Sequence, residues 1–128
     1  MAGAAAGAPA ATATVVVMCA EWCDVCRTLR PSLGELAATR RDVRFVWLDI
    51  EDDAALVGDV DVENFPMLAI FRGDRPVFFG VSLPQQPVIA RLVSAMVEKE
   101  PVEISVPDAI AALPGLLRSR ASLRTSPA

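Results

Sequence analysis

Four short apolar runs in this chain have the length and composition of β-strands. Residues 14–19 are unbroken and mostly β-branched, which is typical of a buried strand. Residues 43–49 place apolar side chains on both of their faces and predict a second strand. Residues 66–72 and 76–79 flank a glycine-containing turn, so they predict an antiparallel hairpin.

Segments whose apolar residues have helical spacing lie between these strands and after the last one. Residues 23–39 predict a long helix whose apolar positions are Val25, Leu29, Leu33, Leu36 and Ala37. Pro31 lies inside that helix and predicts a bend, because proline removes one backbone hydrogen bond. Residues 52–60 predict a short, weak helix, and residues 83–98 predict a closing helix. A long helix between the first two strands indicates a right-handed parallel unit.

The two ends of the chain differ from this core in composition. Residues 1–13 are rich in alanine and lack a basic start and a strongly apolar centre, so we expect a disordered tail rather than a signal peptide. Residues 107–120 form a candidate helix, interrupted by Pro114-Gly115, with apolar side chains on one side. We therefore divide the chain into a tail at 1–13, a domain at 14–98 and a partly helical extension at 99–128.

Composition and charge narrow the function classes. A chain of 128 residues with 53% hydrophobic content can form one domain with a core. The net charge is −4, and the acids gather between Asp49 and Glu63 without a basic residue, which argues against nucleic-acid binding. That acidic run is a solvated surface or, alternatively, a partner-selecting one. No apolar run reaches the ~18–20 residues of a membrane span, and we expect a cytoplasmic location without membrane attachment.

All three cysteines lie where the first strand gives way to the long helix. Cys23 and Cys26 have the Cys-x-x-Cys spacing, and Cys19 precedes them. The thiolate is the nucleophile in disulfide exchange, and a helix N-terminus favours a thiolate over a thiol. Two intervening residues allow a disulfide to close across the first turn. From position, we therefore assign Cys23 as the attacking thiol and Cys26 as the resolving thiol.

Simpler interpretations of the cysteines remain open. Cys-x-x-Cys is also half of a zinc site, but zinc needs four ligands, and the chain has no histidine and one further cysteine. The pair could also be two small core residues without chemistry. Cys19 is expected to be a small buried hydrophobic residue. Alternatively, it is a third redox thiol that traps Cys23 or becomes glutathionylated.

These features resemble the thioredoxin family over about residues 14–97. The active-site loop of that family is similar to Trp22-Cys23-x-x-Cys26-Arg27, preceded here by Ala20 and Glu21. Pro31 matches the proline that kinks the family's active-site helix. Phe65-Pro66 stands where thioredoxins carry a cis-proline beside the dithiol. Further matches are the hairpin turn at Gly73-Asp74 and a glycine after the last strand, Gly80.

The resemblance implies a thioredoxin-like α/β fold, with a mixed four-stranded sheet in the order β-α-β-α-β-β-α and helices flanking it. The fold would lack the strand-helix unit with which thioredoxins usually begin, and it would carry an extra C-terminal helical segment. We expect this segment to dock through its apolar face on the sheet edge that the missing unit leaves uncovered. Alternatively, the segment binds a partner.

The resemblance also implies roles for residues around the dithiol. Trp22 would pack beside Cys23 and help to form the surface that meets a substrate. A cis bond at Pro66 would place the backbone of Phe65 next to the sulfurs, ready to pair with an extended substrate segment. The supporting residues would be Glu21, Asp24, Val25 and Pro31. No bound cofactor and no metal are implied.

Two departures from the family pattern bear on the chemistry. Val17 stands where many thioredoxins have a buried acid that assists proton transfer from the resolving thiol, so protons would move through water or Glu21. The dipeptide between the cysteines is Asp24-Val25 rather than the family's Gly-Pro. The charge of Asp24 beside Cys23 opposes a thiolate there.

We therefore expect a thiol-disulfide oxidoreductase that exchanges electrons with client protein disulfides through Cys23 and Cys26. An upstream reductase or a small thiol would recharge it. The main alternative is a thioredoxin-fold binding or chaperone module in which the dithiol is incidental. A third is a dithiol that ligates a metal or an iron–sulfur cluster with help from a partner.

Overall fold

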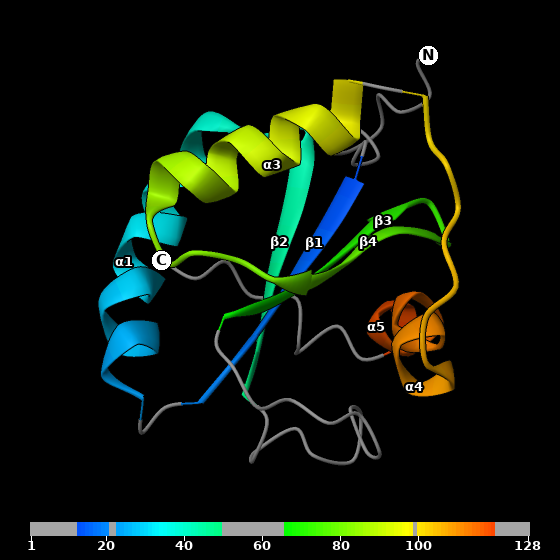
Figure 1. Cartoon of the computed structure of the whole chain (residues 1–128), viewed down its shortest axis with the longest axis horizontal. Coiled ribbons are helices and arrows are strands. Elements are labelled where there is room, and N and C mark those ends of the chain that lie inside the picture. Colours follow the sequence, from blue (N-terminus) through cyan, green and yellow to red (C-terminus); the bar gives the residue numbers. More distant parts are fainter. Residues whose placement is uncertain (1–12, 21–22, 50–65, 99, 120–128) are drawn as a thin grey trace.

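A computed structural model of the chain describes residues 13–20, 23–49, 66–98 and 100–119. Four strands and four helices lie in these ranges (Figure 1). The strands are β1 (Ala13–Cys19), β2 (Val43–Asp49), β3 (Met67–Arg72) and β4 (Arg75–Val81). The helices are α1 (Asp24–Thr39), α3 (Gln86–Glu98), α4 (Asp108–Ala111) and α5 (Leu113–Ser119).

The strands form one mixed sheet in the spatial order β2-β1-β3-β4. β1 runs parallel to β2, with register pairs from Ala13↔Val43 to Cys19↔Asp49, and α1 makes the crossover between them. β1 and β3 are antiparallel, as are β3 and β4. Gly73 turns the β3–β4 hairpin with a φ of 66°, a conformation that glycine adopts without strain. The mixed four-stranded sheet predicted from the sequence is confirmed.

Both faces of the sheet are buried, because β1 and β2 carry apolar residues at successive positions. Alternate side chains of a strand point to opposite faces, and the two faces have separate cores. The α1 side contains Val15, Val17, Cys19, Phe45, Trp47 and residues of α1 and α3. The α5 side contains Val16, Met18, Val46, Leu48, Phe71 and residues of α4 and α5. Figure 1 shows α1 and α3 on one side of the sheet, with α4 and α5 on the other.

α1 presents Cys26, Leu29, Leu33 and Leu36 to the sheet, at helical spacing. Val25 was predicted to join this apolar stripe, but its side chain is 42% exposed. One residue along a helix rotates by about 100°, so the buried position is taken by Cys26 instead. Pro31 lies inside α1 and is exposed. The long helix predicted from the sequence continues past it to Thr39.

Two side-chain hydrogen bonds hold α3 against α1. Gln86 at the start of α3 donates through Nε2 to the carbonyl oxygen of Ser32, at 2.7 Å. Arg40, the C-cap of α1, donates through Nη1 to Oγ of Ser94 in α3, at 2.8 Å. The two helices are therefore fixed to each other at two separate points along their lengths.

The C-terminal extension covers a sheet face, which corrects the prediction that it docks on a sheet edge. Ile110, Leu113 and Leu117 are buried against β1, β2 and β3. A face offers these three side chains far more apolar area than an edge of backbone groups does. The predicted interruption near Pro114-Gly115 is present, because α4 ends at Ala111 and α5 begins at Leu113. Pro114 lies in the first turn of α5, where proline is tolerated.

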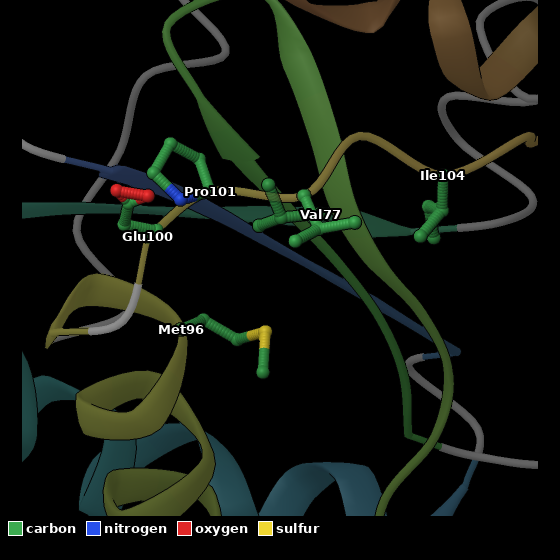
Figure 2. Close-up of a pocket in the computed structure, with 6 residues that line it drawn as sticks. Val77, Met96, Glu100, Pro101 and Ile104 are labelled. Atoms are coloured by element: carbon green, nitrogen blue, oxygen red, sulfur yellow. The ribbon is translucent and has the colours of Figure 1, made fainter.

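The chain between α3 and α4 passes over β4. The backbone N–H of Ile104 donates to the carbonyl oxygen of Pro76, at 2.9 Å. A pocket of about 150 Å³ lies under this segment. Figure 2 shows Met96 of α3 and Val77 of β4 on its walls, with Pro101 above them.

Some predictions on the fold need correction or stay open. Gly80 was placed after the last strand, but β4 continues to Val81, and Gly80 pairs with Leu68. The predicted helix at 52–60 and most of the acidic run lie outside the described residues. The division of the chain after residues 13 and 98 stays a prediction.

No helix in the described ranges combines the length and the apolar character that a membrane crossing requires.

Candidate active site

A disulfide joins Cys19 at the end of β1 to Cys26 in the first turn of α1, with their Cα atoms 5.9 Å apart. Both residues are fully buried. Cys19 follows Val15 and Val17 at every second position, so it faces the same side of the sheet as α1. Cys26 is the first buried residue of α1, so it lies over the strand end from which the chain has just come. Alternation along β1 and helical periodicity in α1 thus bring these two sulfurs together.

This pairing corrects the expected one. The sequence spacing predicted a disulfide between Cys23 and Cys26, whereas Cys26 is bonded to Cys19, and Cys23 is a free thiol. Cys19 is buried, as expected, but it is not an inert core residue. Sequence reasoning placed too much weight on the Cys-x-x-Cys motif. The period-two pattern of β1 places Cys19 on the same face as Val15 and Val17, which makes Cys19 a second candidate partner for Cys26.

Cys23 occupies the N-cap position of α1 and is partly exposed. Its backbone is extended, with φ −88° and ψ 122°, and its N–H donates to the carbonyl oxygen of Ala20 at 3.0 Å. Its own carbonyl accepts the first helical bond, from the N–H of Arg27 at 3.0 Å. Its side chain packs against the apolar cluster that contains Cys19 and Cys26. The three cysteines therefore form one group with two buried members and one at the surface.

The charge next to Cys23 is turned to solvent. The side chain of Asp24 is 86% exposed and forms an ion pair with Arg27, one turn along α1. Water and the guanidinium both reduce the effect of an exposed carboxylate on its neighbours.

A shallow groove of about 370 Å³ lies at the start of α1, the helix that Cys23 caps. Its lining consists of Asp24, Val25 and Thr28 from α1 and Pro84 and Gln85 from the loop before α3. Leu83 in the same loop is 63% exposed, and Val25 is exposed as well. This end of α1 thus offers apolar side chains to solvent next to the free thiol.

Pro66 lies at the same end of the sheet as the cysteines. It directly precedes β3, one residue beyond the register pair Met18↔Met67, which places it opposite Cys19. It is buried, and its carbonyl oxygen accepts a hydrogen bond from the N–H of Ser82, at 3.0 Å. Three other predicted site residues, Glu21, Trp22 and Phe65, lie outside the described residues.

The buried surroundings of the disulfide are apolar. Val17 is fully buried in the cluster that holds Cys19 and Cys26, at the position where the family often has an acid. Trp47 in the same cluster has the guanidinium of Arg30 over its ring, at 5.0 Å from the centroid. Within the described ranges, no carboxylate is buried, and no three His, Cys, Asp or Glu residues gather as metal ligands.

Comparison with known proteins points to one family. The family model for thioredoxin matches residues 8–93. A thioredoxin of Chlamydia trachomatis is 31% identical over 75 residues, which are 59% of this chain and 74% of that protein. Thioredoxin Asp f 28 of Aspergillus fumigatus is 27% identical over 63 residues, which are 49% of this chain and 58% of that protein. The chain thus spans little more than half of the Aspergillus protein.

Solved structures agree on the fold. A mutant thioredoxin from Halobacterium salinarum superposes with a TM-score of 0.59 at 24% identity, over 71% of this chain and 80% of its own. The oxidised mitochondrial thioredoxin 3 of Saccharomyces cerevisiae gives a TM-score of 0.58 at 19% identity, over 66% of this chain and 79% of its own.

Proposed function

This chain belongs to the thioredoxin family, and we propose that it is a thiol-disulfide oxidoreductase that acts on client protein disulfides through Cys23 and Cys26. One observation carries this proposal. The only partly exposed cysteine caps a helix, and a fully buried cysteine lies one turn further along. An attacking thiol must reach a protein client, whereas a resolving thiol must be shielded from everything except the mixed disulfide.

The reaction has two exchange steps. The thiolate of Cys23 attacks a client disulfide, which forms a mixed disulfide and releases one client sulfur as a thiolate. The thiolate of Cys26 then attacks Sγ of Cys23, the Cys23–Cys26 bond forms, and the second client sulfur leaves. Two electrons pass from the protein to the client, and the two protons of the thiols end on the client sulfurs through water. No cofactor takes part.

The groove at the start of α1 supports a protein-sized client. Val25 and Pro84 offer apolar contact at the start of α1, the helix that Cys23 caps, where a client segment would lie. We assign Trp22, Phe65 and Pro66 to the same client surface, with Glu21, Asp24 and Pro31 as supporting residues. An upstream reductase or a small thiol recharges the protein. The proposal places it in the cytoplasm, where disulfides cycle rather than act as permanent cross-links.

Trapping tests the proposal. Cys23→Ser should reduce insulin disulfides no faster than buffer does, because the nucleophile is gone. Cys26→Ser should accumulate a mixed disulfide between Cys23 and insulin, visible as a mass increase that reductant removes. The double variant Cys19→Ala/Cys26→Ser is the matched control, since it excludes resolution by Cys19. Full turnover in Cys23→Ser, or no mixed disulfide in the double variant, contradicts the proposal.

A second function is favoured by the observed pairing. The bonded pair, Cys19 and Cys26, is fully buried and so resembles a cross-link that stabilises a fold more than a redox centre. In that case the protein is a binding or chaperone module that recognises partners through a surface of the thioredoxin fold. Such a module would keep its partner in both the Cys23→Ser and the Cys26→Ser variant, whereas the oxidoreductase would not.

A further inference from the structure

We infer that Cys19 is a third redox thiol, which takes over the disulfide from Cys23 after each turnover and stores it as a buried Cys19–Cys26 bond. This inference rests on the proposed function, since it needs Cys23–Cys26 as the first product. It explains why the Cys-x-x-Cys motif favours a Cys23–Cys26 bond, whereas the structure contains a Cys19–Cys26 bond. The two pairings become successive states of one site.

Cys26 is the shared member of both pairs. It is bonded to Cys19, and Cys23 precedes it by three residues at the start of the same helix. Residues three apart on a helix are surface neighbours, and Cys23 packs against the cluster that holds both bonded cysteines. Exchange requires one sulfur to approach a disulfide formed by the other two. The packing of Cys23 against the cluster that contains Cys19 and Cys26 places the three cysteines close enough together for this approach.

The transfer step is a single internal exchange. The thiolate of Cys19 attacks Sγ of Cys26 in the Cys23–Cys26 disulfide. The Cys19–Cys26 bond forms, the Cys23–Cys26 bond breaks, and Cys23 leaves as a thiolate. The proton lost by Cys19 ends on the departing sulfur of Cys23. The oxidation state of the protein does not change, so no further oxidant or reductant is required.

Burial favours the inner pair. With the Cys23–Cys26 bond, a thiol is left at Cys19, which is fully buried in an apolar cluster. With the Cys19–Cys26 bond, the remaining thiol is at Cys23, where water reaches it. A polar or ionisable group is more stable in water than in an apolar interior. The transfer therefore moves the remaining thiol outward and the apolar disulfide inward.

Two consequences follow for the oxidised protein. It retains a reactive thiol at the surface, so it can attack a second client disulfide or the disulfide of a small thiol. In addition, a large partner cannot reach the buried disulfide directly. It can exchange electrons with the protein only after Cys23 has attacked Cys26 and restored the Cys23–Cys26 bond. Recharging by an upstream reductase thus also begins at Cys23.

The cysteine map of the oxidised protein tests this inference. Reduced protein is mixed with an excess of insulin, stopped with acid at intervals, alkylated, and cleaved after glutamate and before aspartate. Cleavage after Glu21 and before Asp24 separates the three cysteines into three peptides. We expect the Cys23–Cys26 bond at early times and the Cys19–Cys26 bond at late times, with alkylated Cys23. A final map with the Cys23–Cys26 bond and alkylated Cys19 overturns the inference.

Two variants separate transfer from an independent structural bond. In Cys19→Ala, the oxidised protein should keep the Cys23–Cys26 bond and contain no thiol that can be alkylated. In Cys23→Ser, insulin should oxidise Cys19 and Cys26 more than about tenfold more slowly than in the unmodified protein, because the entry thiol is missing. Equal rates show that the inner bond forms without Cys23, which overturns the inference. The proposed function fails with that outcome as well, because insulin is then reduced without Cys23. A final map of the unmodified protein that keeps the Cys23–Cys26 bond, by contrast, overturns the inference alone.

Discussion

The two faces of the sheet share the same strands but differ in what covers them. On one face, α1 and α3 pack over Val15, Val17 and Cys19, and every cysteine of the chain lies there. On the other, α4 and α5 pack over Val16, Met18 and Phe71, with apolar side chains throughout. The first covering lies almost wholly within the residues that the family model matches, whereas the second lies beyond them, because the match ends at residue 93.

The α1 face carries the reactive groups, whereas the α5 face contributes only to stability. The α1 face provides a helix start, a strand end and three sulfurs within one cluster. The α5 face contributes the hydrophobic effect, since Ile110, Leu113 and Leu117 remove apolar area from water on both sides of the contact. A change on the α5 face should therefore alter stability without altering the order in which cysteines pair. A change on the α1 face should alter both.

The largest effect is expected from shortening Leu113, which is fully buried on the α5 face. Leu113→Ala should lower the free energy of unfolding by about 2–5 kcal/mol, from lost transfer energy and the cavity left behind. Urea denaturation measures this loss. The cysteine map of the fraction that stays folded should be unchanged.

The matched control is Leu83→Ala, because Leu83 is a leucine with 63% of its surface exposed. Its effect on the free energy of unfolding should stay within about 0.5 kcal/mol. If both variants are equally stable, α5 does not contribute to the core, and the contrast between the two faces is wrong.

These faces also show what the sequence could and could not predict. The prediction that residues 43–49 place apolar side chains on both faces is confirmed, with Phe45 and Trp47 on one face and Val46 and Leu48 on the other. This prediction succeeds because period-two burial needs only local information. The docking place of the extension was predicted wrongly. It depends on which apolar area is left free after the rest of the chain has folded, and no local pattern contains that information.

The site was predictable to a similar extent. The helix start at residue 24 and the exposure of Cys23 follow from the motif and its position before an amphipathic helix. The partner of Cys26 does not, because two cysteines lie within reach of it. Only the geometry of the strand end decides that Cys19 forms the bond.

The second largest effect is expected from reducing the disulfide on the α1 face. The Cys19–Cys26 bond closes a loop across seven positions of sequence. Such a short loop restricts the unfolded chain enough to stabilise the folded protein by roughly 2 kcal/mol. Urea denaturation of oxidised and reduced samples should show that difference.

Cys23→Ala provides the comparison for this measurement, since it leaves the bonded pair in place. The difference between its oxidised and reduced forms should match that of the unmodified protein. If the difference disappears in Cys23→Ala, the stabilising bond involves Cys23, and the assignment of the cross-link to Cys19 and Cys26 fails.

A smaller effect is expected from the groove at the start of α1. Replacing Val25 by serine removes apolar area that a client would cover, which corresponds to about 1 kcal/mol for half of a valine side chain. We expect a rise of about fivefold in KM for insulin, with little change in kcat. Val102→Ser is the control, because Val102 is 71% exposed and does not line the groove. Equal KM values in the two variants show that clients do not use the groove.

The smallest effect is expected at the opposite end of α1, where Arg40 holds Asp42. Nε and Nη2 of Arg40 donate to the two carboxylate oxygens, at 3.0 and 2.9 Å. This hydrogen bonding is the main cause that lowers the pKa of Asp42 below its ordinary value of 3.8 and raises the pKa of Arg40. The side chains of Arg40 and Asp42 are 23% and 44% exposed, so solvent screens the pair in part, and Asp42→Asn should cost at most about 1 kcal/mol of unfolding free energy at pH 7.

The contribution of this pair to the free energy of unfolding depends on pH in a defined direction. A carboxyl group whose pKa is lower in the folded state stabilises the fold fully above its unfolded pKa, near 3.8, and loses this contribution as the pH falls through the folded pKa. The difference between the unmodified protein and Asp42→Asn should thus be constant from pH 7 to about 5 and shrink below pH 4. A difference that persists at low pH indicates a structural effect of the amide instead. Because the pair lies at the end of α1 away from the sulfurs, the cysteine map should be the same in both proteins.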